Sequence, residues 1–289
     1  MRLAPIAFVV WAISTGLGAV EAAAETKPAS PARGSARTCE YTPDMPPRVA
    51  PLRDQALTRE RYSNLAKAWR QYLDAHPEAA IGYAYLWRAR RYAQEAVGDE
   101  GMQIIQKAYT IDPECPLILM ELAYLQFGES LASGKPPMNE VRRLSERAIE
   151  LAPEWYEPHV NLLGQAMVLG DDTQVRQQLE AILHKGGIES PLLDYGYNLL
   201  VSTEPDAILL TNGDNDTFPA LAVQRVHGVR PDVLIVNLSL LNVAAYARST
   251  LVATLSHPGP LTAAEIDALV HADAQSPKTL QPLIVADLA

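Results

Sequence analysis

The residues best suited to chemistry lie in one stretch, residues 207–242. An apolar run from Ala207 to Thr211 ends in a polar group made of Asn212, Asp214, Asn215, Asp216 and Thr217. A second apolar run, Val233 to Asn237, is followed by Ser239 and Asn242. Short continuous apolar runs are typical of strands that are covered on both faces. The polar residues therefore follow two predicted strands at the point where each strand ends.

The segment between the two runs is long enough for a helical crossover, which predicts parallel neighbouring strands. We expect the helix to be capped by Thr217 and to end near Gly228 and Pro231, with Pro219 tolerated in its first turn. The carboxyl ends of parallel strands meet at one edge of a sheet, where ligands bind in open α/β folds. The polar residues should then face one another across a crevice.

Several kinds of chemistry are open to this crevice. Asp214 and Asp216 could ligate a divalent cation or bind sugar hydroxyls, or one of them could act as a general base. The same residues commonly hydrogen-bond their own backbone at a turn and cap the next helix. Phosphate binding is disfavoured because the turn holds one glycine, Gly213, and two carboxylates would repel the anion. The sequence shows no nucleophile with a base, so we assign no catalytic residue and no cofactor beyond a cation.

Composition and the N-terminus limit the class of protein. The chain has 289 residues and a net charge of -10, which argues against a nucleic-acid partner. Residues 1–24 combine Arg2, an uncharged apolar run and a small-residue site at Ala22 to Ala24, which is typical of a signal peptide. An uncleaved anchor is the alternative. We expect a periplasmic or secreted protein with no membrane span after signal removal.

Residues 25–57 are rich in proline and poor in large apolar side chains, which predicts a flexible linker. Cys39 lies in this segment and Cys115 beyond it. They could pair in an oxidising compartment, although the count alone does not establish a bridge.

Residues 58–190 show helical periodicity and three repeated landmarks: His76-Pro77-Glu78, Asp112-Pro113-Glu114 and Ala152-Pro153-Glu154. Each proline would stop one helix before the next pair begins, and Ala108 and Ala148 precede two of them at equal spacing. This pattern resembles the tetratricopeptide repeat, although the spacing between landmarks is longer than in that family. A generic helical bundle is the alternative.

The tetratricopeptide resemblance implies a curved stack with a concave groove that binds a protein or peptide. By register with that family, the groove would be lined by Arg88, Arg91, Tyr124, Phe127, Asn161 and Gln165. The alternative is that the arginines are solvated surface residues and that Tyr124 and Phe127 belong to the core.

Residues 191–289 form the predicted second domain, a small parallel βαβ, Rossmann-like α/β unit. The runs Asn212 to Pro219 and Val236 to Asn242 resemble the soluble region that follows the membrane helices in bacterial protein O-mannosyltransferase-like membrane proteins, which use lipid-linked sugars. Residues 281–286 resemble a later strand of that region, so we expect a strand over Leu283 to Ala286. The domain could be minimal or truncated, because the family region continues further.

Three functions follow from these patterns. The first is a periplasmic interaction or scaffold module tied to envelope glycan or glycoprotein assembly, with a protein segment, and in addition a glycan, as partner. The second is a carbohydrate-active or hydrolytic enzyme that uses the Asp-x-Asp crevice. The third is a purely structural repeat protein. The absence of a recognisable nucleophile–base pair favours a non-enzyme.

Overall fold

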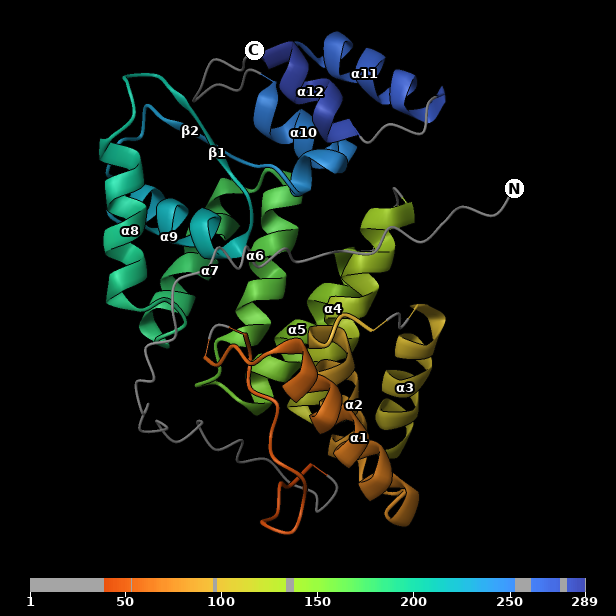
Figure 1. Ribbon diagram of the computed structural model, residues 1–289. Helices are drawn as coiled ribbons and strands as arrows, with labels where there is room; N and C mark the ends of the chain where they lie inside the picture. Colours follow the sequence, from red (N-terminus) through yellow and green to blue (C-terminus); the bar gives the residue numbers. More distant parts are fainter. Residues whose placement is uncertain are drawn as a thin grey trace. The chain divides into compact units, whose positions relative to one another are not determined.

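The computed structural model describes residues 39–52, 54–95, 98–133, 138–252, 261–275 and 280–288. The predicted signal peptide and the first part of the predicted linker lie outside these ranges. Helices dominate the described residues, and one small parallel sheet of two strands accompanies them (Figure 1). The chain divides into two compact units, Met1–Gly128 with Asn139–Pro158, and Glu129–Met138 with His159–Ala289.

Consecutive helices begin at Thr58, whose side chain accepts a hydrogen bond from the backbone N–H of Arg61 and caps the first helix. They are α1 (Arg59–Ala75), α2 (Ala80–Tyr92), α3 (Gly98–Ile111), α4 (Pro116–Ser133), α5 (Met138–Leu151), α6 (Glu157–Leu169) and α7 (Asp172–His184). Pro77, Pro113 and Pro153 all lie in turns between helices. The architecture agrees with a helical repeat array, whereas its assignment to the tetratricopeptide family stays a prediction.

The core of the first unit is built around α2, which packs between α1 and α3. Residues 80–90 of this helix are buried on every side. Ala108 and Ala148 are fully buried, as expected of small residues at which helices approach closely. Trp69 of α1 is also fully buried and stacks on Tyr85 of α2 at 5.1 Å between ring centroids.

Residues 39–52 and 54–57, which we call the strap, pack onto these helices. Cys39 is disulfide-bonded to Cys115, and Val49 is 1% exposed. Trp69 Nε1 donates to the carbonyl of Pro47 at 3.0 Å. The prediction of a flexible linker does not hold for this part of residues 25–57. Prolines lower the entropy that an extended segment loses on ordering, and its carbonyls find donors on the helices.

The second unit holds α8 (Ser190–Val201), β1 (Ile208–Thr211), α9 (Asp214–Arg225), β2 (Leu234–Asn237), the 3₁₀ turn η1 (Leu240–Asn242), α10 (Ala244–Leu251), α11 (Ala263–Gln275) and α12 (Leu280–Leu288). The strands β1 and β2 are parallel, with Ile208 opposite Leu234 and Thr211 opposite Asn237. Helix α9 is the crossover and packs against α7, α8 and β2. The predicted βαβ arrangement is confirmed.

Two details of the second unit differ from the predictions. Helix α9 begins at Asp214 rather than after Thr217, because Gly213 occupies the cap position. Thr217 and Pro219 therefore lie inside the helix, and both are buried. The predicted strand over Leu283 to Ala286 was wrong, since these residues belong to α12. A short apolar run does not by itself distinguish a strand from a buried helix, and Pro282 is tolerated in a first helical turn.

Over the described ranges, none of the helices combines the length and the apolar character that a membrane crossing requires.

Candidate functional site

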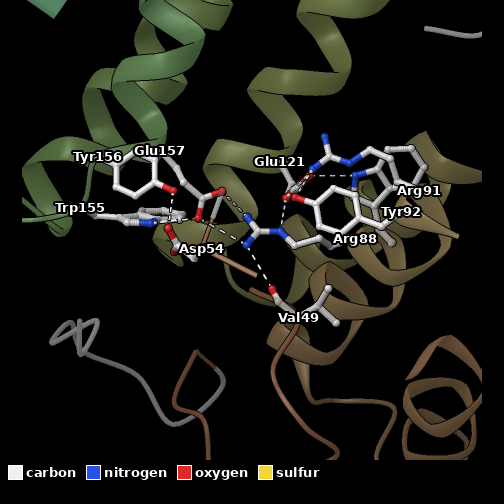
Figure 2. A network of polar contacts seen from close by, with 10 residues as sticks. Val49, Asp54, Arg88, Arg91, Tyr92, Glu121, Trp155, Tyr156 and Glu157 are labelled. Carbon is white, nitrogen blue, oxygen red and sulfur yellow. Dashed lines mark hydrogen bonds and ion pairs between the residues drawn. The ribbon is translucent and has the colours of Figure 1, made fainter. Parts of the chain in front are cut away.

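Side chains from α2, from α4 and from the start of α6 form a buried ionic network in the first unit (Figure 2). Arg88 of α2 donates from Nε to Glu121 Oε1 of α4 at 2.7 Å and from Nη2 to Glu157 Oε2 of α6 at 2.9 Å. Its Nη1 donates to the carbonyl of Val49 in the strap at 3.3 Å. Each nitrogen of this guanidinium therefore has an acceptor. The strap lies directly on the charge that organises the network.

Neighbouring side chains satisfy the two carboxylates. Trp87 Nε1 donates to Glu121 Oε2 at 2.9 Å, and Trp155 Nε1 donates to Glu157 Oε1 at 3.0 Å. A second strap contact lies beside them, where the hydroxyl of Tyr156 donates to Asp54 Oδ1 at 2.9 Å (Figure 2). Buried carboxylates require such donors, because desolvation otherwise disfavours their charge.

The two glutamates differ electrostatically. Burial opposes the ionisation of Glu121, but Arg91 and Arg88 outweigh it and hold the pKa of Glu121 below its ordinary value. Burial raises the pKa of Glu157, and the negative charges of Glu121 and Asp54 act in the same direction against Arg88. Glu121 therefore favours the charged form more strongly than Glu157 does. Both carboxylates raise the pKa of Arg88 despite its burial, so this side chain stays cationic.

Four of the six predicted groove residues lie in the first unit. Arg88 is 2% exposed and engaged with the strap, whereas Arg91, Tyr124 and Phe127 are half-buried. Arg91 lies over the ring of Tyr124, with its guanidinium carbon 4.0 Å from the ring centroid. Arg91 Nε is buried and has no hydrogen-bond acceptor among the described residues.

Asn161 and Gln165, the remaining groove residues, are buried in the second unit at 5% and 1% exposure. Sequence reasoning missed the contact of the strap with Arg88, one of the predicted groove residues. The strap's hydrogen bonds to the helices are made largely through backbone carbonyls, which any sequence carries. The one available signal was Cys39, whose bond to Cys115 fixes the start of the strap.

The polar rim predicted at the end of β1 is organised by Asp216. Its carboxylate accepts the backbone N–H of Asn212 at 2.7 Å and that of Gly213 at 2.9 Å. This pattern closes the turn and caps α9, as acidic residues near helix N-termini commonly do. The hydroxyl of Ser239 donates to the carbonyl of Asn212 at 3.2 Å and joins the two strand ends.

A buried chain of side chains lies behind this turn. Thr211 Oγ1 is 2.7 Å from Thr217 Oγ1, and Asn237 Nδ2 donates to Thr217 Oγ1 at 3.0 Å. Asn237 Oδ1 also accepts the backbone N–H of Leu240 at 3.1 Å, which begins η1. These contacts fasten α9 between the ends of the two strands. Most polar groups at the ends of β1 and β2 therefore form hydrogen bonds that hold the two strands and α9 together.

The remaining rim residues lie at the surface. Asn242 donates to the carbonyl of Ser239 at 3.3 Å and contacts Gln281 of α12. Asp214 and Asn215 are exposed in the first turn of α9. Across the described part of the chain, no group of three His, Cys, Asp or Glu side chains could hold a metal ion. Ligand binding or metal binding at Asp214 and Asp216 stays a prediction.

Comparison with known families finds one match, over residues 192–263, to the family model described as TMEM260-associated domain 2. The match begins in α8 and ends in α11, and so includes β1, α9 and β2. This family is protein O-mannosyltransferase-like, in agreement with the resemblance seen in the C-terminal third. No curated protein and no solved structure matches the chain.

Proposed function

We propose that this chain is a non-catalytic interaction module whose helical array binds an extended protein segment. The observation that carries the proposal is the strap, an extended segment that already lies on α1 and α2. Arg88 and Trp69 donate to its carbonyls, Tyr156 donates to its Asp54, and Val49 is buried among them. Recognition through carbonyl groups and one buried side chain suits extended peptides.

The partner segment docks at the half-buried side chains of Arg91, Tyr124 and Phe127. Arg91 lies one helical turn beyond Arg88 on α2, and Tyr124 lies one turn beyond Glu121 on α4. The side chain of Arg91 is 19% exposed, and the accessible part of its guanidinium can donate to a partner carbonyl, as Arg88 does to Val49. The rings of Tyr124 and Phe127 supply apolar surface beside it.

The proposed setting is the cell envelope, in glycan or glycoprotein assembly. The N-terminal sequence is typical of an exported protein, and the Cys39–Cys115 bond suits an oxidising compartment. The match of residues 192–263 to a glycosylation-related family supports the link to glycan assembly. The enzyme hypothesis has less support, since the carboxylate of Asp216 holds two backbone N–H groups of its own turn.

Photo-crosslinking tests the docking site. A benzophenone amino acid in place of Phe127 should capture extended segments of envelope proteins, whereas the same group in place of Arg143, on the exposed face of α5, should not. The double variant Arg91→Lys, Tyr124→Leu keeps the positive charge but removes the planar guanidinium group and the aromatic ring. It should reduce capture at least about tenfold, because a lost hydrogen bond and a lost cation–π contact each weaken binding.

The melting temperature of the double variant serves as its folding control. Equal capture at both positions, or capture that the double variant leaves unchanged, would show that partners do not use this face.

A further inference from the structure

One edge of β1 faces away from β2. The carbonyls of Ala207 and Thr211 accept the N–H groups of Leu234 and Leu238, at 2.9 Å and 2.8 Å. Backbone groups alternate in direction along a strand, so those of Ile208 and Leu210 point away from β2. Among the described residues, the sheet contains no strand besides β1 and β2. Two residues of β1 therefore present their N–H and C=O groups to a further strand.

The side chains on this edge are apolar and exposed. Ile208 is 37% and Leu210 is 42% exposed, although their partners across the ladder, Leu234 and Val236, are half-buried and fully buried. The residues that bury this face of β2 therefore do not bury the same face of β1. Parallel strands are normally covered on both faces, and exposed apolar edges usually carry charge that prevents pairing. The sequence of β1, Ile-Leu-Leu-Thr, carries none.

Acidic residues lie at both ends of this edge. Glu204 and Asp206 precede β1, and Asp214 follows it; all three are exposed. Arg230, a cation near this end, is paired with Asp232 at 2.7 Å and also donates to the backbone carbonyls of Thr203 and Glu204. The carboxylates of Glu204 and Asp206 form no ion pair with a described residue. A segment laid along β1 would meet negative charge at each end.

We infer that β1 is a docking edge for an extended segment of another protein, with alternating apolar residues and with Lys or Arg at its ends. The segment adds a strand through the backbone groups of Ile208 and Leu210, covers their side chains, and places its cations beside the acidic ends. A second copy of this chain fits poorly. Pairing two β1 edges would bring the acidic ends of both copies together, and like charges oppose such pairing.

A labelled peptide with blocked termini tests the inference on the full-length protein. The probe is Lys-Lys-Val-Thr-Val-Thr-Val-Lys-Lys, and its control has Glu in place of each Lys. Fluorescence anisotropy should show that the Lys-flanked peptide binds at least about tenfold more tightly, with an advantage that salt reduces. Methylation of its alternate backbone nitrogens should abolish binding, because the added strand then lacks its donors.

Variants locate the binding. Leu210→Pro removes an outward N–H without breaking the ladder to β2 and should weaken binding about tenfold. Glu204→Lys with Asp206→Asn changes exposed residues and should remove the preference for the Lys-flanked peptide. Glu146→Lys, which changes an exposed acid on α5, should leave this preference unchanged. The Glu204 and Asp206 variant keeps the test valid if Leu210→Pro fails to fold.

Three results would overturn the inference: no binding of the Lys-flanked peptide, binding insensitive to both edge variants, or self-association that Leu210→Pro abolishes. The last result would assign the edge to a second copy. The experiment probes the second unit alone. Its failure would therefore leave the proposed binding of a partner segment to α2 and α4 unaffected.

Discussion

Two glutamates share one guanidinium, yet their environments give them different roles. Glu121 is fully buried and contacts both Arg88 and Arg91, whereas Glu157 contacts Arg88 and lies near the negative charge of Asp54. Glu121 therefore supplies the charge that the two arginines require. Glu157 is the carboxylate whose ionisation the fold opposes.

Neutral isosteres should separate these roles. Glu121→Gln leaves two buried arginines short of a countercharge and should lower the free energy of unfolding by about 3 kcal/mol at pH 7. Glu157→Gln keeps Glu121 beside Arg88 and should cost about 1 kcal/mol. Urea denaturation followed by tryptophan fluorescence measures both values. Equal costs for the two variants would contradict the asymmetry.

The pH dependence of the Glu157→Gln variant has a definite sign. The folded-state pKa of Glu157 lies above its ordinary value of 4.5, so the folded protein keeps a proton that the unfolded chain releases. The free energy of unfolding of the wild type therefore falls, relative to the variant, as pH rises from 4.5 through the raised pKa. The cost of Glu157→Gln should be largest in acid and should shrink towards neutral pH. A cost that grows with pH would refute this assignment.

At the scale of elements, the sequence predicted the parallel pair β1 and β2 and the helical pattern from Thr58 correctly. Both depend on local periodicity and on the length of a crossover, which the sequence displays. It failed for α12, because Leu283 to Ala286 is too short for periodicity to distinguish a strand from a helix. The predicted start of α9 was also too late. Asp216 lies inside the helix, and its carboxylate closes the turn that precedes it.

The candidate site was predictable only in part. Residues at the ends of β1 and β2 could be placed together, because parallel topology fixes where strands end. The hydrogen bond from Arg88 to the strap could not be predicted, because it joins the carbonyl of Val49 to a helix that lies far along the chain. Such contacts are set by tertiary packing and leave no periodic pattern in either segment.

The packing of α8 on α9 rests on Gly196. A β-carbon at this position would lie 2.6 Å from the carbonyl carbon of Pro219 and 2.8 Å from the N of Ala220, both of them backbone atoms. Gly196→Ala should therefore lower the free energy of unfolding by about 1–3 kcal/mol, because the helices must move apart. Thermal unfolding followed by circular dichroism measures the loss.

Gly128 of α4 offers a matched control for this prediction. Apart from its chain neighbours and the nearby backbone of its own helix, no atom of a described residue lies within 4 Å of a β-carbon built there. Gly128→Ala should stabilise the protein by about 0.5–1 kcal/mol through the lower entropy of the unfolded chain. If Gly196→Ala is equally harmless, the close approach of α8 and α9 is not needed for stability.

At the scale of the whole molecule, the chain consists of two units with different means of stabilisation. The first is fastened by a disulfide with a sequence separation of 76 and by a buried ionic network. The second has a two-stranded sheet held by its crossover helix and a buried threonine–asparagine chain. Trp69, Trp87 and Trp155, the tryptophans among the described residues, all lie in the first unit. Tryptophan fluorescence therefore reports on the unit that contains the disulfide.

Removal of the disulfide should act on the first unit alone. The bond between Cys39 and Cys115 restricts the unfolded chain, so Cys39→Ser with Cys115→Ser should lower the free energy of unfolding by about 2–4 kcal/mol. The transition followed by tryptophan fluorescence should shift to lower urea concentration. The hydrogen-exchange protection of β1, β2 and α9 should stay unchanged, whereas Gly196→Ala should reverse this pattern. A double serine variant that loses protection equally in both units would show that they fold as one cooperative body, because the loss would then have spread beyond the strap and its helices.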